Sequence, residues 1–193
     1  QNDEDFKYYN NYNKLFKSDN FLIIAVEKKG KLDKEFINNF DSISSKLLNL
    51  DEVKQVFSFI DAPILFLNNT KLTNLSGDNI DNLRNSNLEL KKVIEEFTNN
   101  PVYINQIINK EANVFSIIIY LKKNLQLIKA KEDYKNLNIS KKQYLDIKNL
   151  NDQERNQLIN EIRAIINEAD KTHSYYLGGI EMIANDVINF VKN

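Results

Sequence analysis

The side chains that most often carry catalysis are sparse in this sequence. It contains one histidine, His173, and no cysteine. Thiol chemistry, disulfides and cysteine-ligated zinc are therefore excluded, and a zinc site would need three carboxylates beside the single imidazole. A lone histidine is more often a structural or surface residue than a catalyst. We expect no catalytic residue, no metal site and no cofactor, and hence no enzyme.

Sequence signatures of phosphate binding and of hydrolysis are missing as well. The chain has no glycine-rich dinucleotide loop, no phosphate-binding loop ending in Gly-Lys-Ser/Thr and no Gly-x-Ser-x-Gly elbow. An anion site would need an arginine beside backbone N–H groups. Arg84 lies in a polar loop, Arg155 and Arg163 lie on a predicted helix, and none adjoins a glycine-rich turn. A small hydrolase is therefore the least favoured functional hypothesis, behind a transporter domain and a binding module.

Apolar side chains offer the better candidates for a binding surface. The largest local concentration outside a regular helical stripe comprises Phe57, Phe59, Ile64, Leu65 and Phe66. Packing in the core is the favoured interpretation of this group. The alternative is a path or surface for a hydrophobic substrate or a partner domain.

Two tyrosines and two glycines near the end of the chain form the second candidate region. Tyr175 and Tyr176 occupy adjacent positions of a predicted strand, so they should face opposite sides of the sheet. Helices can bury at most one of them, and the other can contact a partner. Gly178 and Gly179 then form a structural turn, which is either a tight junction between the sheet and the last helix or an ordinary C-terminal turn.

Four strands are expected from the hydrophobic pattern. Residues 21–26 form a continuous apolar run of the kind found in buried central strands. Residues 53–60 alternate between two faces of a strand, with Phe57 and Phe59 on one face. Pro63 ends this strand, because proline cannot donate a hydrogen bond to the sheet ladder. The remaining two strands are predicted over 114–121 and 174–177.

Helices are expected between these strands. Asp33 can cap a helix whose apolar stripe recurs every three or four residues. Residues 61–85 are irregular, and Ser86 with Glu89 has the spacing of a capping box that opens a helix ending before Pro101. Ser140 with Gln143 predicts a short helix of its own. A separate long helix is capped by Asn151 or Asp152, and further helices are predicted over 3–17 and from Ile183 onward.

The order of these elements predicts the fold class. Leaving out the helix after residue 61, the order is β-α-β-β-α-β, the split pattern of ferredoxin-like α+β folds. Both remaining helices would pack on one face of an antiparallel sheet. We therefore predict one domain over 1–193, with an inserted helical segment at about 61–112 between the second and third strands.

Charge and hydropathy exclude several kinds of partner. The 193 residues carry 26 basic and 27 acidic side chains without a long run of either sign. Nucleic-acid binding normally needs a basic stripe, so no nucleic-acid partner is expected, and a polybasic membrane patch is not indicated either. No apolar run approaches the roughly 18 residues that a membrane helix requires.

The order of several motifs resembles a known family of transporters. The stretch Tyr8–Leu15, then Phe16, then the strand Phe21–Glu27 with Lys29-Gly30, is similar to the opening of the first large periplasmic loop of RND-superfamily exporters of the MMPL and hopanoid-transporter type. A helix ending in a leu-x-x-val-x-x-val-x-ser strand follows in that family, and here it corresponds to Leu50–Ser58. The segment Tyr175–Ile183 resembles the family's tyr-x-x-gly-gly-x-pro turn, with Glu181 where proline is frequent.

This resemblance implies a non-enzymatic function at a membrane. The chain would be a periplasmic loop of a bacterial inner-membrane protein, a porter domain of a proton-driven exporter that guides a hydrophobic or lipid-like substrate. Its partners would be the transporter's membrane helices and second porter domain. A homo-oligomer of the full-length protein is also compatible with this resemblance. The alternative is a soluble periplasmic binding or interaction module on the same ferredoxin-like fold.

Overall fold

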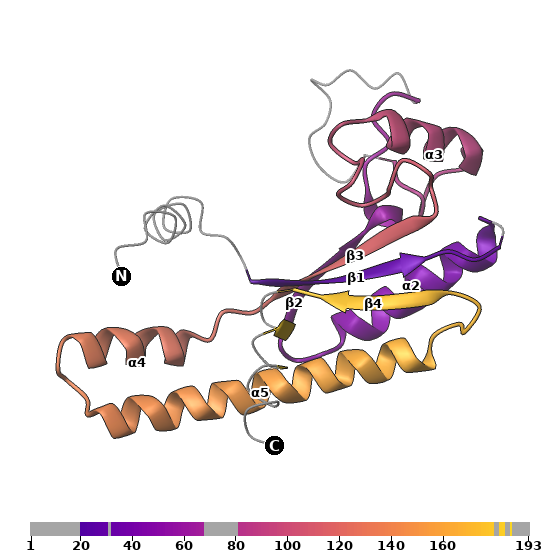
Figure 1. The fold of residues 1–193 in the computed structure, drawn as a ribbon. Coiled ribbons are helices and arrows are strands. Elements are labelled where there is room, and N and C mark those ends of the chain that lie inside the picture. Colours follow the sequence, from indigo (N-terminus) through magenta and orange to yellow (C-terminus); the bar gives the residue numbers. More distant parts are fainter. Residues whose placement is uncertain (1–19, 31, 68–80, 180–181, 184–185, 187–193) are drawn as a thin grey trace.

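The computed structural model describes residues 20–30, 32–67, 81–179, 182–183 and 186. The helix predicted over 3–17 lies outside these residues, as does most of the one predicted from Ile183 onward. The elements are shown in Figure 1 and are, in order, β1 (Phe21–Glu27), α2 (Lys34–Leu48), β2 (Val53–Ser58), the 3-10 turn η1 (Phe59–Asp61), α3 (Leu90–Asn99), β3 (Val114–Leu121), α4 (Leu125–Lys135), α5 (Lys141–Glu168) and β4 (Ser174–Gly178).

The four predicted strands form one antiparallel sheet, so the α+β class is confirmed. The strand order is β2-β3-β1-β4. β1 pairs with β3 on one side and with β4 on the other, and β2 pairs with β3, all antiparallel. The two strands with the longest apolar runs, β1 and β3, are therefore the central ones, each paired with a neighbour along both edges.

The second strand ends earlier than predicted. It stops at Ser58, where the backbone N–H and the hydroxyl of Ser58 both donate to the carboxylate of Asp61, at 2.8 and 2.7 Å. This local bonding competes with the sheet ladder and turns the chain into η1. The prediction that Phe59 continues the strand on the face of Phe57 is therefore wrong, and Phe59 is rotated into the core instead.

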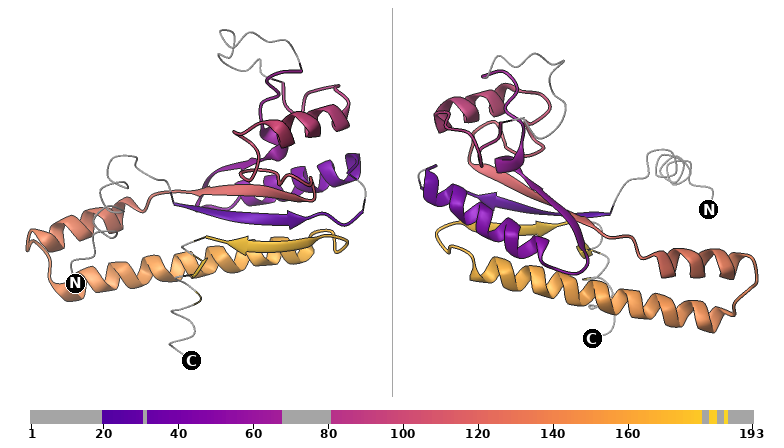
Figure 2. Two further views of the ribbon diagram at one scale, coloured as in Figure 1. Left: turned by 45° about the horizontal axis from the view of Figure 1, so that its top comes forward. Right: turned by 180° about the vertical axis from the view of Figure 1, so that it is seen from behind.

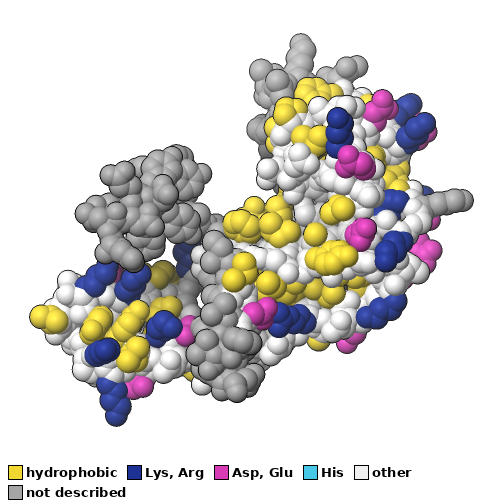
Figure 3. Space-filling model, in the orientation of Figure 1, with side chains coloured by type: hydrophobic (Ala, Val, Ile, Leu, Met, Phe, Trp, Pro, Cys, Tyr) yellow, Lys and Arg dark blue, Asp and Glu magenta, His cyan; other side chains and the backbone are white. Residues whose placement is uncertain are grey.

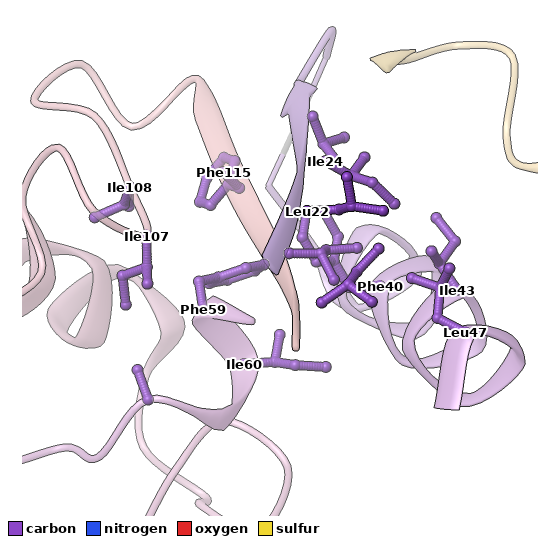
Figure 4. Close-up of a cluster of buried hydrophobic side chains, with 14 of the residues drawn as sticks. Leu22, Ile24, Phe40, Ile43, Leu47, Phe59, Ile60, Ile107, Ile108 and Phe115 are labelled. Atoms are coloured by element: carbon purple, nitrogen blue, oxygen red, sulfur yellow. The ribbon is translucent and has the colours of Figure 1, made fainter. Parts of the chain in front are cut away.

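Helices α2 and α5 cover one face of the sheet, as the two views of Figure 2 show. Asp33 caps α2 as predicted, accepting a hydrogen bond from the N–H of Phe36 at 3.1 Å. The predicted stripe of α2 is buried against inward side chains of β1 and β3 (Figure 4). The centre of this core consists of Leu22, Ile24, Phe36, Phe40, Ile43, Leu47, Phe59, Phe115, Ile117 and Ile119.

The segment between β3 and β4 differs from its prediction in two respects. Ser140 and Gln143 form the predicted capping box, but the helix that they open is a single 28-residue helix, α5. Asp152 is an interior residue of this helix, and its carboxylate binds Lys148 at 2.7 Å instead of capping a new one. Helix α4 was not predicted, and it packs antiparallel on the first half of α5. The two helices form a hairpin that extends beyond the end of the sheet (Figure 1).

A segment that contains α3 lies between β2 and β3, where the inserted helical segment was predicted, and we call this segment the insertion. The capping box predicted at its start is wrong, because the hydroxyl of Ser86 accepts from the N–H of Leu88 at 3.0 Å and the side chain of Glu89 makes no capping bond. Buried residues of the insertion join the core of the sheet in one continuous cluster. They are Ile60, Ala62, Ile64, Val93, Ile94, Phe97, Tyr103, Ile107 and Ile108.

Candidate functional site

The face of the sheet opposite α2 and α5 presents apolar side chains to solvent. Strand residues alternate between faces, so the inward positions of β1, such as Leu22 and Ile24, leave Phe21 and Ile23 on the outer face. The register then aligns outer residues of neighbouring strands in rows. We call the outer-face set the open sheet face, and it consists of Phe21, Ile23, Phe57, Ile118, Tyr120 and Tyr176.

The open sheet face is continuous across all four strands. Phe57 of β2 lies beside Ile118 of β3, which lies beside Ile23 of β1. Phe21 and Tyr120 form a ring pair with centroids 6.5 Å apart. Hydrophobic side chains gather over the strands in the space-filling view (Figure 3). Contiguous exposed apolar area of this kind marks sites where proteins bind apolar ligands or other proteins.

Exposure is greatest on the outer side of β1 and β4. The side chains of Phe21 and Tyr176 are 44% and 57% exposed. Tyr176 also provides a polar boundary, because its hydroxyl donates to the carboxylate of Glu27 at 3.2 Å. At the far end of β3 the hydroxyl of Ser116 donates to the carbonyl of Gln106, so the insertion closes the face there. The open sheet face is therefore apolar along β1 and bounded by polar contacts at the Glu27 end.

A second apolar depression lies on the insertion, between α3 and residues 65–67. This α3 groove has a volume of about 660 Å³ and is lined in part by Phe66, Leu67, Glu96, Pro101 and Val102. Glu96 is almost fully buried there and accepts hydrogen bonds from three successive backbone N–H groups, those of residues 65, 66 and 67, at 2.6, 3.2 and 3.0 Å. Its carboxylate is thus used to hold the chain that carries Phe66, which is a structural role.

Tyr103 holds the segment after α3 against the chain at Pro63. Its hydroxyl donates to the carbonyl of Pro63 at 2.8 Å, and its ring packs on Phe97 with centroids 4.9 Å apart. Burial raises the pKa of Tyr103 above its ordinary value, and the negative charge of Glu96 raises it further. The hydroxyl therefore stays protonated at neutral pH and remains a hydrogen-bond donor.

The structure divides the predicted site residues among three places. Phe59 and Ile64 are core residues, whereas Leu65 and Phe66 belong to the segment held by Glu96 beside the α3 groove. Phe57 and Tyr176 belong to the open sheet face. Tyr175 faces the opposite side, as predicted, and its hydroxyl accepts a hydrogen bond from Asn39 of α2 at 2.7 Å. Burial raises the pKa of Tyr175, and the bond from Asn39 opposes that rise.

The turn residues Gly178 and Gly179 have different environments. Gly178 pairs with Ile23 at the end of β4. Gly179 has a φ of +133° and packs against the backbone of Phe21 and Leu22. Only Gly179 therefore approaches another backbone closely, and this places the end of β4 directly beside the start of β1. Most of the helix predicted to follow lies outside the described residues, so the predicted junction of sheet and helix stays a prediction.

His173 has a structural environment. Its side chain is largely buried, its Nδ1 accepts from the N–H of Lys29 at 3.3 Å, and its ring meets that of Phe36 edge to face at 5.0 Å. Asp170 lies 3.5 Å from its Nε2, and hydrogen bonds from Thr172 lower the pKa of that carboxyl. Within the described ranges there is no cluster of three or more side chains that could hold a metal ion.

The arginines are engaged in contacts within the chain. The guanidinium of Arg84 binds Asp61 at 2.5 Å and also Asp41, and that of Arg163 binds Asp186 at 2.9 and 3.0 Å. Arg155 lies on a helix, as predicted, and is buried.

Sequence reasoning missed four of the six residues of the open sheet face, namely Phe21, Ile23, Ile118 and Tyr120. A signal was present, because each occupies an alternate position of a strand that had been predicted. Continuous apolar runs indicate burial on both faces, and that inference concealed the outward half of each strand.

Comparison with protein-family models, with curated proteins and with solved structures gives no match. Among the helices that the structure describes, none combines the length and apolar character needed to cross a bilayer.

Proposed function

We propose that this chain is a non-enzymatic porter domain of an RND-type exporter, located on the periplasmic side of a bacterial inner membrane. Its open sheet face contacts a hydrophobic or lipid-like substrate. The observation that carries the proposal is this face, an apolar surface that spans all four strands, with Phe21 and Tyr176 each about half exposed.

We propose further that the fold is the ferredoxin-like βαββαβ arrangement. Three facts support this. The strand order is β2-β3-β1-β4 with every pair antiparallel, so β1 and β2 run parallel with β3 between them. Helices α2 and α5 follow β1 and β3 and lie on the same face. The insertion with α3 interrupts only the connection between β2 and β3.

The arrangement of the first and last strands supports attachment to a membrane. Ile23 of β1 pairs with Gly178 of β4, and Gly179 packs on Phe21. The chain therefore enters and leaves the sheet at the same end. A domain whose two ends lie close together can be inserted between two successive membrane helices, because neither connecting segment has to cross the domain.

Binding of a long-chain amphiphile tests the role of the open sheet face. We expect the chain to bind a fluorescent fatty acid, and the double variant Phe21→Ser with Tyr176→Ser to bind it at least about 10-fold more weakly, because each replacement removes apolar contact area. A fluorescence titration measures the dissociation constants. Thermal unfolding of the variant checks that its fold is retained.

The α3 groove supplies the matched control. Phe66 is also exposed and apolar but lies in the groove, so Phe66→Ser should leave the affinity within about 2-fold of the parent. If Phe66→Ser lost binding and the double variant kept it, the ligand would bind in the α3 groove. That result would refute the assignment to the open sheet face.

The coding sequence around this domain tests the transporter assignment separately. We expect it to encode an apolar membrane helix on each side of the domain and a second domain of the same kind further on. A signal peptide directly before Gln1 together with a stop codon directly after Asn193 would instead support the alternative, a soluble periplasmic binding module.

A further inference from the structure

The segment from the end of β3 to the first part of α5 carries a net positive charge that the rest of the chain lacks. Residues 122–150 contain eight lysines and three acidic residues, a net charge of +5, whereas the other residues together have a net charge of −6. The lysines are dispersed in sequence and interrupted by acidic and apolar residues, which is why no basic run is visible there. The fold collects them on two short antiparallel segments. They are Lys122, Lys123, Lys129, Lys131, Lys135, Lys141, Lys142 and Lys148.

Large apolar side chains are exposed among these lysines. The two helices pack through an inner seam, in which the rings of Tyr134 and Tyr144 stack with centroids 5.1 Å apart and Asn124 donates to Asn151 at 3.1 Å. This seam leaves other apolar residues pointing outward, and hydrophobic and basic side chains are seen together on this lobe (Figure 3). The exposed apolar residues are Leu125, Ile128, Leu137, Leu145 and Leu150.

Leu137 occupies the tip of the hairpin in an unfavourable backbone conformation. Its φ is +60°, in the left-handed region, and it follows the C-terminal end of α4 where glycine is usual. The N–H of Asn138 bonds to the carbonyl of Asp133 at 2.8 Å, which is the pattern of a Schellman turn. The side chain of Leu137 is 87% exposed, so it makes little contact that would offset this strain.

We propose that the tip of the α4–α5 hairpin binds the surface of an anionic phospholipid bilayer. The lysines would contact lipid phosphates while Leu137 and its apolar neighbours enter the headgroup region, which is the division of roles seen in interfacial helices. A nucleic acid would satisfy the charge but not the exposed leucines, so a bilayer is the better match. This inference depends on the charge and exposure of the hairpin and not on the proposed transport function.

Tryptophan fluorescence tests contact of the tip with lipid directly, because the chain contains no tryptophan. In the full chain, Leu137→Trp should give a blue-shifted emission on addition of vesicles of phosphatidylglycerol and phosphatidylcholine, and no shift with phosphatidylcholine alone. Val102→Trp is the matched control, because Val102 is also apolar and largely exposed but lies on the insertion. Its emission should not change with either kind of vesicle.

Vesicle co-sedimentation with two charge-matched variants tests the role of the lysines. Each lysine near an anionic surface strengthens binding about 5-fold, so four substitutions should weaken partitioning by at least about 100-fold. The same number of substitutions elsewhere should change it by less than about 5-fold. The first variant replaces with glutamine Lys131, Lys135, Lys141 and Lys142. The second variant replaces with glutamine Lys34, Lys91, Lys92 and Lys110.

Leu137→Gly separates binding from folding. Glycine suits a φ of +60°, so this variant should unfold at the same temperature as the parent or higher, yet bind anionic vesicles about 10-fold more weakly. The proposal is overturned if the unmodified chain does not bind anionic vesicles, or if both lysine variants lose binding equally. Binding to duplex DNA or RNA without binding to vesicles also overturns it.

Discussion

Replacing Phe59 with alanine is expected to lower the free energy of unfolding by about 3–5 kcal/mol. The side chain is fully buried at the junction of η1 with the sheet and α2. Its ring centroid lies 4.6 Å from that of Phe115, 4.8 Å from that of Phe40 and 6.0 Å from that of Phe36. Alanine would leave a cavity between three aromatic rings from α2 and β3, and none of them can move into it without leaving its own contacts.

Phe66 is the matched control for this prediction. It belongs to the same apolar segment of sequence and is the same residue type, but its side chain is 64% exposed. Phe66→Ala should therefore change the stability by no more than about 0.5 kcal/mol. Urea denaturation of both variants gives the comparison. Similar losses in the two would mean that Phe66 is packed as tightly as Phe59, and the division of this segment into core and surface would be wrong.

The four strands and helix α2 could be predicted because their signals are local. The stripe of Phe36, Phe40, Ile43 and Leu47 and the cap at Asp33 are properties of one short segment, and both appear in the structure. The apolar runs of β1 and β3 likewise needed no knowledge of their partners.

The elements predicted wrongly depend on competition between local signals. Ser58 and Asp61 end β2 because a side-chain bond replaces a ladder bond, and nothing in the alternating pattern of residues 53–60 reveals which wins. Asn151 and Asp152 are good capping residues, yet no glycine or proline lies between 141 and 168, so α5 continues through them. Capping residues indicate where a helix can begin. A new helix begins at them only if a residue such as glycine or proline ends the preceding helix.

The candidate binding surfaces were hidden because they are properties of the assembled fold. The open sheet face requires the register that places Phe57, Ile118 and Ile23 side by side. The basic hairpin requires α4 to fold back on α5, since its eight lysines are spaced over residues 122–148. The sequence has no long basic run and so did not indicate a polybasic patch, whereas the fold brings these lysines together on one hairpin.

Replacing Gly179 with alanine is expected to lower the free energy of unfolding by about 2–6 kcal/mol. Its φ of +133° belongs to a region that residues with a Cβ avoid, at about 1–3 kcal/mol each. A Cβ there would also lie 3.0 Å from the carbonyl oxygen of Phe21 and 3.0 Å from Cδ2 of Leu22. The carbonyl belongs to the start of β1, so relief requires β1 and β4 to separate where they meet, which adds a cost of similar size.

Gly178→Ala is the control, because the two glycines are adjacent and the substitution is identical. A Cβ on Gly178 would meet only the carbonyl oxygen of Ile23, at 4.0 Å, which is ordinary contact. Its stability should stay within about 0.5 kcal/mol of the parent in the same urea denaturation. Equally small changes at both positions would indicate an ordinary turn, and equally large losses would contradict the assignment of the close approach to Gly179 alone. A loss confined to Gly179 would show that the first and last strands are held together by a backbone approach that only glycine allows, which is the contact that brings the entry and exit of the domain to one end of the sheet.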